Sequence, residues 1–183
     1  MSLNIENYAG SIDFPAIDAG EYEIVLKAEK KTTKDGSKEF INLDFKIRDD
    51  VEQKYNNGKT HVFDKAWRDA KNPEWFDLKK LGAILLTQKG LEGYKNEFTE
   101  VDEFIQYING ITFRITVDKK YDDYDQKEVN SVRYLSYKPS KHEGPYVEPV
   151  KDSASEPVQD TGNVVADNPA HVNEPNLQDS DLS

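Results

Sequence analysis

The first part of the chain alternates between hydrophobic and polar residues. Within residues 21–29 every second side chain is apolar, and the same period returns within residues 41–48. A period of two is typical of strands that bury one face. The pair Asp35-Gly36 lies between the two runs and favours a tight turn. The pattern therefore predicts a β-hairpin whose turn is rich in lysine.

The pattern changes after a third alternating run, residues 59–66, which makes the first three predicted strands a meander. Apolar residues then recur every three or four positions, and Pro73 suits the first turn of a helix. A second, short helix is predicted over residues 99–107, where Thr99 and Asp102 resemble a capping box.

Two more alternating runs, 111–118 and 128–137, complete the order of elements. Three strands, a helical insertion and two strands is the order of the OB-fold, a five-stranded Greek-key barrel. The predicted fold class is therefore mainly β: a five-stranded OB-fold barrel with one or two helices between strands three and four. A rolled or open α+β sheet gives the same order and stays an alternative.

The composition changes after Lys138. Nine of the 35 acidic residues lie beyond it, against two of the 24 basic residues, so the net charge of −11 divides into −7 and −4. The same stretch has no hydrophobic period and is rich in Pro, Asp, Glu, Ser and Asn, which predicts a disordered acidic tail. The predicted domains are residues 1–138, which fold, and residues 139–183, the tail.

Several kinds of site and segment are excluded by composition. The chain has no cysteine, so it has neither a disulfide framework nor a thiolate metal site. Its three histidines, His61, His142 and His171, are scattered, and no metal, cofactor or catalytic triad is predicted. No run approaches the roughly 18 apolar residues of a membrane helix, and no signal peptide is evident. A cytoplasmic protein is expected.

Basic and aromatic side chains gather on predicted strands two to five and in the neighbouring loops. Lysine and arginine contact phosphates and exposed aromatic rings stack on bases, which together bind single strands without reading their sequence. The candidate DNA-binding residues are Lys31, Lys34, Lys38, Lys46, Arg48, His61, Phe63, Trp67, Arg68, Arg114, Tyr121, Tyr124, Arg133 and Tyr134. Each has a plainer interpretation: turn lysines are commonly only solvated, and Phe63 and Trp67 would serve equally well in a core.

Four segments also carry a likeness to known proteins: PAIDAGEYEIVLKAEKKTTKDGSKEFINLDFKI, NGKTHVFDKAW, EWFDLKKLGAILLTQKG and FRITVDKKYDDYDQKEVNSVRYLSYKPS. Together they resemble the phage single-stranded-DNA-binding protein family of OB-fold type, formerly catalogued as a phage domain of unknown function. The resemblance covers about residues 12–140. It implies an OB-fold, sequence-tolerant binding of single-stranded DNA, and work in phage DNA replication, recombination or repair inside a bacterial host cell.

The predicted function is therefore a non-catalytic single-stranded-DNA-binding protein. One alternative is an accessory module for a phage recombinase or helicase, in which the acidic tail contacts phage or host replication and recombination proteins. Another is a magnesium-dependent nuclease, in which Asp44 and Lys46 act with Asp18 or Glu21. The tail could also compete with DNA for the basic face. The oligomeric state stays open.

Overall fold

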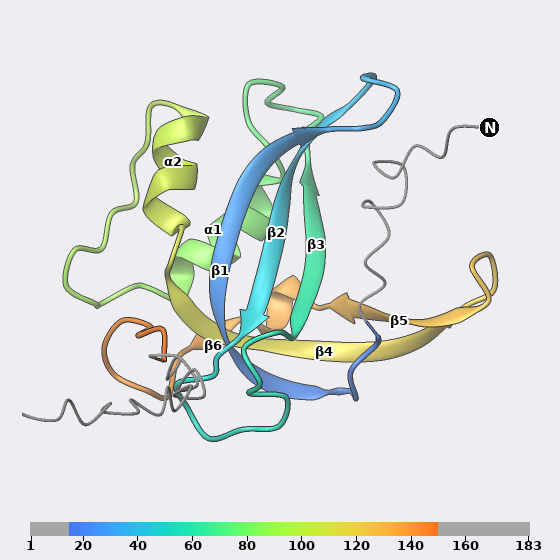
Figure 1. Ribbon diagram of the computed structural model, residues 1–183. Coiled ribbons are helices and arrows are strands. Elements are labelled where there is room, and N and C mark those ends of the chain that lie inside the picture. Colours follow the sequence, from blue (N-terminus) through green and yellow to red (C-terminus); the bar gives the residue numbers. More distant parts are fainter. Residues whose placement is uncertain (1–14, 150–183) are drawn as a thin grey trace, which may run out of the picture. The chain divides into compact units, whose positions relative to one another are not determined.

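The computed structural model describes residues 15–149 (Figure 1). Its elements are β1 (Gly20–Thr32), β2 (Glu39–Ile47), β3 (His61–Trp67), α1 (Leu78–Leu86), α2 (Val101–Ile108), β4 (Thr112–Asp122), β5 (Lys127–Val132), the 3₁₀ turn η2 (Tyr134–Ser136) and β6 (Lys138–Pro139). The predicted mainly β architecture with two helices between the third and fourth strands is confirmed.

The strands form one antiparallel sheet of six strands in the order β3-β2-β1-β4-β5, with β6 paired to β4. β3 and β5 are the two ends of this order, and within residues 15–149 no ladder joins them. The two strands nevertheless line one groove, together with residues 15 and 16. The sheet is therefore strongly rolled but open along the line between β3 and β5.

β1 is the strand that both halves of the sheet share. It pairs with β4 through Gly20–Val25 and with β2 through Ile24–Thr32. In Figure 1, β1, β2 and β3 stand upright while β4 and β5 cross beneath them, and β1 curves from one direction into the other.

Side-chain amides complete the hydrogen bonding of β1 where a neighbouring strand is missing. The amide of Asn109 accepts from the backbone N–H of Ala28 (2.6 Å) and donates to its carbonyl (3.1 Å). The amide of Gln53 does the same for Glu23, with both distances 2.9 Å. These amides replace the groups that a paired strand would supply, so the switch of partner leaves no buried backbone group unpaired at either residue.

The core lies between the rolled sheet and the two helices. Phe45 on β2 is fully buried, and its ring meets those of Phe113 and Tyr137 at centroid distances of 6.1 and 6.0 Å. The core side chains are Ile17, Tyr22, Ile24, Leu26, Ala28, Ile41, Leu43, Phe45, Ile47, Val62, Ala66, Phe76, Leu81, Ile84, Phe104, Ile108, Phe113, Ile115 and Val117. Alternate positions of each long strand supply most of this set, as the sequence pattern predicts.

The two helices begin later than the sequence suggests. α1 begins at Leu78, because the carboxylate of Asp77 accepts the N–H of Lys80 (3.1 Å) and caps it, while Pro73 lies in the preceding turn. α2 begins after Glu100, and the expected Thr99–Asp102 capping box is wrong. Its nearest equivalent is the side chain of Glu103, which accepts the backbone N–H of Thr99 (3.2 Å).

The last predicted strand is divided into three pieces: β5 ends at Val132, η2 follows, and β6 returns to β4. The chain then continues as an ordered segment, residues 140–147, which we call the C-terminal strap. Glu23 accepts from the hydroxyl of Ser140 (2.7 Å) and the N–H of Lys141 (2.8 Å). The chain divides into compact units after Pro149, whereas the domain end predicted from the sequence is residue 138. Residues 150–183 of the predicted disordered tail lie outside the described residues.

We expect the substitution Phe45→Ala to lower the free energy of unfolding by about 3–5 kcal/mol, because it leaves a cavity among packed rings. Urea unfolding at neutral pH measures this loss. The matched control is Leu135→Ala, whose side chain is 86% exposed and whose removal should cost less than about 0.5 kcal/mol. Equal midpoints for the two variants would contradict the described core.

Candidate nucleic-acid interface

One face of β3 carries a row of exposed aromatic and basic side chains. Val62 and Ala66 point into the core, and the residues on the other alternation point outward. We call the outward residues His61, Phe63, Lys65 and Trp67 the β3 strip. Neighbouring members are two residues apart, about 6.6 Å along the strand. Phe63 and Trp67 are each 41% exposed, which places them on the surface rather than in the core.

The upper end of the β3 strip is a platform made by two strands. Phe40 on β2 lies opposite Trp67, with ring centroids 5.0 Å apart. The ammonium of Lys65 lies 4.9 Å from the ring centre of Phe40 and 5.5 Å from that of Trp67. A cation over aromatic rings is attracted by their negative faces, so Lys65 is held beside the stacking surface.

Lys65 is absent from the residues that the sequence singled out, although the signal for it was present. In the segment HVFDKAW it falls on the same alternation as Phe63 and Trp67. Because strand side chains alternate between faces, any residue two positions from both aromatics must share their face.

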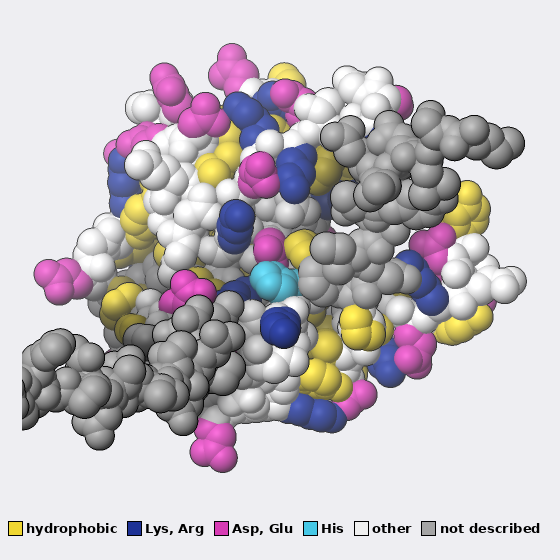
Figure 2. Space-filling view, viewed as in Figure 1, with side chains coloured by type: hydrophobic (Ala, Val, Ile, Leu, Met, Phe, Trp, Pro, Cys, Tyr) yellow, Lys and Arg dark blue, Asp and Glu magenta, His cyan; other side chains and the backbone are white. Residues whose placement is uncertain are grey.

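The lower end of the β3 strip is fixed by a polar contact. The Nδ1 atom of His61 lies 2.6 Å from a carboxylate oxygen of Asp44 on β2, and its ring stacks on Phe63 with an interplanar angle of 10°. The carboxylate orients the imidazole and also places negative charge on this face. Figure 2 shows the same mixture over β1, β2 and β3, where Lys and Arg side chains alternate with acidic and hydrophobic ones.

The turn between β1 and β2 holds its lysines away from the sheet. Asp35 accepts hydrogen bonds from the hydroxyl of Thr33 (2.5 Å) and from the N–H of Ser37 (3.1 Å). These bonds, that from Thr33 most of all, lower the pKa of Asp35 to about 2. The turn is thus internally braced, and Lys34 and Lys38 are exposed on it.

A groove joins this turn to the β3 strip. Its walls are formed by Ser37, Lys38, Glu39, Trp67 and Arg68. Arg68 forms an ion pair with Glu39 and its guanidinium lies over the ring of Phe76 at 4.3 Å. Lys31, at the end of β1, is also exposed but pairs with Glu29 at 3.3 Å. The predicted residues of the turn, β3 and the following Arg68 therefore lie along one continuous surface.

Lys46 and Arg48 are placed differently from the expectation that both line the outward face of the second strand. Arg48 is 2% exposed, lies past the end of β2, and pairs with Asp50 at 2.7 Å. The ammonium of Lys46 donates to the hydroxyl of Tyr146 in the C-terminal strap (2.7 Å). That hydroxyl in turn donates to Asp49 (2.7 Å). The expected outward placement of Arg48 is wrong, and Lys46 is half-buried beneath the strap.

The predicted arginines on the fourth and fifth strands also have internal partners. Arg114 is bonded to Glu21 (2.6 Å) and to the carbonyl of Pro139 (2.8 Å). Arg133 lies just after β5 and pairs with Asp118 at 2.6 Å. These ion pairs join β4 to neighbouring segments. They account for the presence of both arginines without any contact to DNA.

The predicted tyrosines lie apart from the β3 strip. Tyr121 is 62% exposed and Tyr124 is 94% exposed, both at the hairpin between β4 and β5. In Figure 1 the tip of this hairpin lies on the same side of the upright strands as the β1–β2 turn, below it. Tyr134 is half-buried in η2. The structure therefore puts some of the predicted residues on one continuous surface and the two exposed tyrosines on a hairpin whose β5 strand shares a groove with His61 and Phe63. The predicted Arg48, Arg114 and Arg133 belong to neither group.

The acids proposed for a magnesium-dependent nuclease have other partners. Asp18 forms an ion pair with Lys54, and Glu21 is held by Arg114 and by Lys138 (2.7 Å). Within residues 15–149 no group of three or more His, Asp or Glu side chains is placed to hold a metal ion. In the same part of the chain, no helix has the length and apolar character to cross a membrane.

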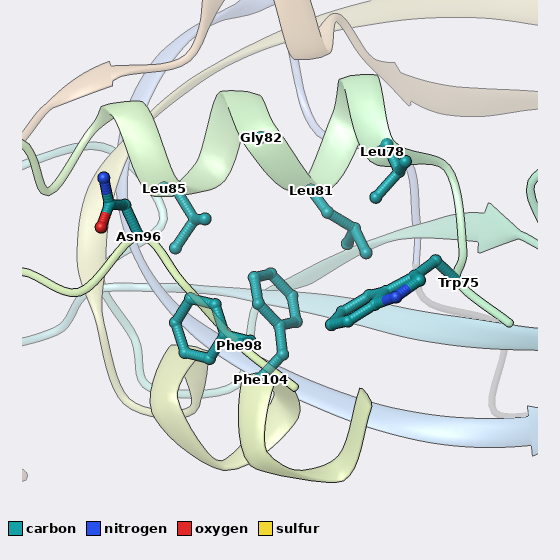
Figure 3. A pocket seen from close by; sticks show the side chains of 8 residues that line it. All are labelled: Trp75, Leu78, Leu81, Gly82, Leu85, Asn96, Phe98 and Phe104. Atoms are coloured by element: carbon teal, nitrogen blue, oxygen red, sulfur yellow. The ribbon is translucent and has the colours of Figure 1, made fainter. Parts of the chain in front are cut away.

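A further hollow lies between the two helices, away from the β3 strip (Figure 3). Trp75 precedes α1, Leu81 and Leu85 belong to it, and Phe98 and Phe104 face them from the α2 side. The rings of Phe98 and Phe104 meet edge to face at a centroid distance of 5.1 Å. This hollow is apolar and offers no titratable side chain for catalysis.

The compact part of the chain corresponds to a known family. A family model described as a protein of unknown function, DUF669, matches residues 4–146. The chain belongs to the DUF669 family. The match ends at Tyr146, so the DUF669 region includes the sheet and all but the last residue of the C-terminal strap. A search of curated proteins found no match.

The carboxylate of Glu21 on β1 joins Arg114 on β4 and Lys138 on β6, and the contribution of these ion pairs to stability can be measured. Hydrogen bonds from Lys138 and then Arg114 lower the pKa of Glu21 from 4.5 to about 2. A lowered pKa means that the carboxylate stabilises the fold above pH 4.5 and loses this effect as the pH falls toward 2. After allowance for solvent screening, we expect Glu21→Gln to cost about 1 kcal/mol at neutral pH.

Urea unfolding at a series of pH values measures this effect. The difference between the natural chain and Glu21→Gln should shrink as the pH falls below 4.5. The control is Glu92→Gln, which removes the same charge from an exposed loop. A difference that stays constant down to pH 2 would contradict the assigned role of the Glu21 carboxylate.

Proposed function

We propose that this protein binds single-stranded DNA on the outer face of β2 and β3 and on the adjoining β1–β2 turn. The observation that carries the proposal is the β3 strip, in which two aromatic side chains, each 41% exposed, alternate with Lys65. Exposed large aromatic rings in a row are unusual on a surface that only meets water. They match a ligand that presents flat faces at regular intervals.

In this proposal the protein binds the DNA strand and catalyses no reaction on it. Bases stack on Trp67 and Phe63, and every base offers a π-face, so the binding tolerates any sequence. Lys65, Lys38 and Lys34 contact the phosphates that follow the stacked bases. A duplex cannot bind in this way because its bases are already stacked on one another. The protein would cover single strands or pass them to other proteins.

The topology supports the proposal that the domain is an OB-fold. The sheet order β3-β2-β1-β4-β5 brings the first and fourth strands side by side and leaves the third and fifth at the ends, where they line a common groove. In OB-folds, the second and third strands and the first and fourth loops bind oligonucleotides or oligosaccharides. The β3 strip and the turn at Lys34 lie at the corresponding places.

The cellular role follows from the resemblance to phage single-stranded-DNA-binding proteins. We propose action in phage DNA replication, recombination or repair, in the cytoplasm of a bacterial host. The acidic residues 139–183, with a net charge of −7, would compete with DNA for the basic positions or contact replication and recombination proteins.

The second candidate function is a protein-interaction module for a phage recombinase or helicase. The apolar hollow of Trp75, Phe98 and Phe104 favours it, because such surfaces commonly receive apolar side chains of other proteins. Binding to DNA is favoured over this candidate because the exposed rings of the β3 strip have lysines beside them.

Salt dependence separates the two candidates. We expect fluorescence anisotropy with a labelled single strand of mixed sequence to show affinity falling between about 50 and 200 mM salt. The log-log slope should be about −0.7 for each phosphate contact, so about −2 for three lysines. The duplex of the same sequence should bind much more weakly. Absence of binding, or an affinity that is flat with salt, would contradict the DNA proposal and favour the protein-interaction module.

The substitution Trp67→Ala tests the stacking surface. Base stacking on an aromatic side chain contributes about 1–3 kcal/mol, so the affinity for a single strand should fall at least fivefold. The salt slope should stay unchanged, because no cation is removed. Leu86→Ala is the control, since Leu86 on α1 is 62% exposed and outside the proposed interface. Equal affinities for the two variants, both shown to be folded by circular dichroism, would exclude Trp67 from the interface.

A further inference from the structure

The C-terminal strap ends beside the lower end of the β3 strip. Lys46 on β2 lies directly opposite His61 on β3, and each alternates with buried neighbours along its strand. Residues that lie opposite each other in an antiparallel pair share one face of the sheet. The ammonium of Lys46, which the strap covers, therefore lies in line with the surface proposed to bind DNA.

Tyr146 and Val147, which we call the strap tip, contact Lys46 and the two acidic residues after β2. The hydroxyl of Tyr146 accepts from the ammonium of Lys46 (2.7 Å) and donates to Asp49 (2.7 Å). The ring centre of Tyr146 lies 4.9 Å from the same ammonium. The N–H of Val147 donates to Asp50 (3.3 Å). The strap tip thus takes the place of solvent over a cation of the outer face.

The groups around this ammonium are of the kinds that a nucleotide presents. The ring and the oxygen of Tyr146 lie on Lys46, and the carboxylate of Glu148 adds negative charge beside it. Burial alone would lower the pKa of Lys46, but the hydroxyl of Tyr146 and the charges of Asp49 and Glu148 raise it above its ordinary value. The ammonium is therefore fully charged at neutral pH and suited to a phosphate.

The beginning of the strap is held more firmly than its tip. The carboxylate of Glu23, which accepts from Ser140 and from the N–H of Lys141, is buried. Val147 is exposed, so its hydrogen bond competes with water. Gly144 lies between the two ends at a φ of +88°, in the region where glycine alone moves without strain. The strap tip is therefore the part that leaves the sheet at the lower cost.

We propose that the strap tip occupies the place of one nucleotide at the lower end of the DNA interface, and that a bound single strand displaces it from Lys46. The inference rests on the proposed function. A phosphate replaces the hydroxyl of Tyr146 on the ammonium, and the strand extends from the β3 strip past His61 onto β2. The strap lowers the affinity for DNA because its contacts must be broken first. This contact belongs to ordered residues and is distinct from repulsion by the acidic tail.

The substitution Tyr146→Phe tests the displacement by fluorescence anisotropy on the full chain. The labelled strand has mixed sequence and about 16 nucleotides, the upper end of the site sizes of OB-folds. Phenylalanine removes both hydroxyl bonds and leaves the net charge unchanged, so the acidic tail cannot cause a difference. We expect the affinity to rise about threefold to tenfold, the effect of one hydrogen bond. The control is Tyr94→Phe, the same change in the loop between α1 and α2, which should leave the affinity unchanged.

Lys46→Met shows whether the gain comes from this ammonium. In the Lys46→Met background, Tyr146→Phe uncovers no cation, so it should give no gain in affinity. Circular dichroism checks that all variants fold. A gain of the same size with and without Lys46 would place the effect elsewhere and overturn the proposal.

Amide hydrogen exchange, followed by NMR on the natural chain, reports on the strap itself. A saturating single strand should speed the exchange of the Val147 N–H, which loses Asp50, while the N–H of Lys141 stays protected by Glu23. Exchange of Val147 that stays unchanged or slows in the DNA complex would show that the strap tip stays in place and would overturn the displacement.

The outcomes separate this proposal from the proposed function. Equal affinities of the natural chain and Tyr146→Phe for the single strand would overturn the displacement and leave the proposed function standing. Weaker binding by Tyr146→Phe would make the tyrosine a contact of the strand and would likewise overturn it. Failure of both the natural chain and Tyr146→Phe to bind would overturn the proposed function itself.

Discussion

The double pairing of β1 is the constraint on which the rest of the structure depends. One strand cannot lie flat in two ladders that run in different directions, so β1 must bend where its partner changes from β4 to β2 near Ile24 and Val25. The bend turns the apolar faces of both halves toward one core, which the helices complete. It also exposes backbone groups on both edges of β1, and Gln53 and Asn109 satisfy these with their side-chain amides. Asn130 does the same for Ile17 just before β1.

The same bend creates the surface proposed to bind DNA. Rolling the sheet brings its two end strands toward each other, but β3 keeps an outer edge that no strand of the described part covers. On that side, backbone groups of β3 are met by an isolated bridge between Arg68 and Phe76, by the bond from Lys80 to the Lys65 carbonyl, and by the Asp64 carboxylate on the Lys65 N–H. An uncovered edge normally invites aggregation, and charged side chains at the edge oppose it. Lys65, Lys80 and Asp64 therefore protect β3 while leaving its aromatic face accessible.

The sequence predicted the strands well because alternation reports directly which side chains are buried, and Phe63, Lys65 and Trp67 share a face for that reason alone. It failed for ion pairs between distant segments. Nothing near Arg114 shows that Glu21 will lie against it, since the pairing of β1 with β4 decides this. The sequence did not predict the C-terminal strap for a related reason. Polar contacts of Ser140 and Tyr146 hold the strap in place, and such contacts leave no hydrophobic period in the sequence.

These ion pairs also change how the charge of the protein should be understood. Several of the basic groups that the sequence offers for phosphates are already neutralised: Arg48 by Asp50, Arg114 by Glu21, and Arg133 by Asp118. The lysines of the braced turn and Lys65 carry most of the remaining attraction at the proposed interface, and Asp44 opposes it. A binding face with so few available cations cannot rely on electrostatics alone. In the proposed mode of binding, stacking on Trp67 and Phe63 supplies the larger share of the affinity, because it does not depend on net charge. On these terms a net charge of −11 is compatible with the proposal that the protein binds a polyanion.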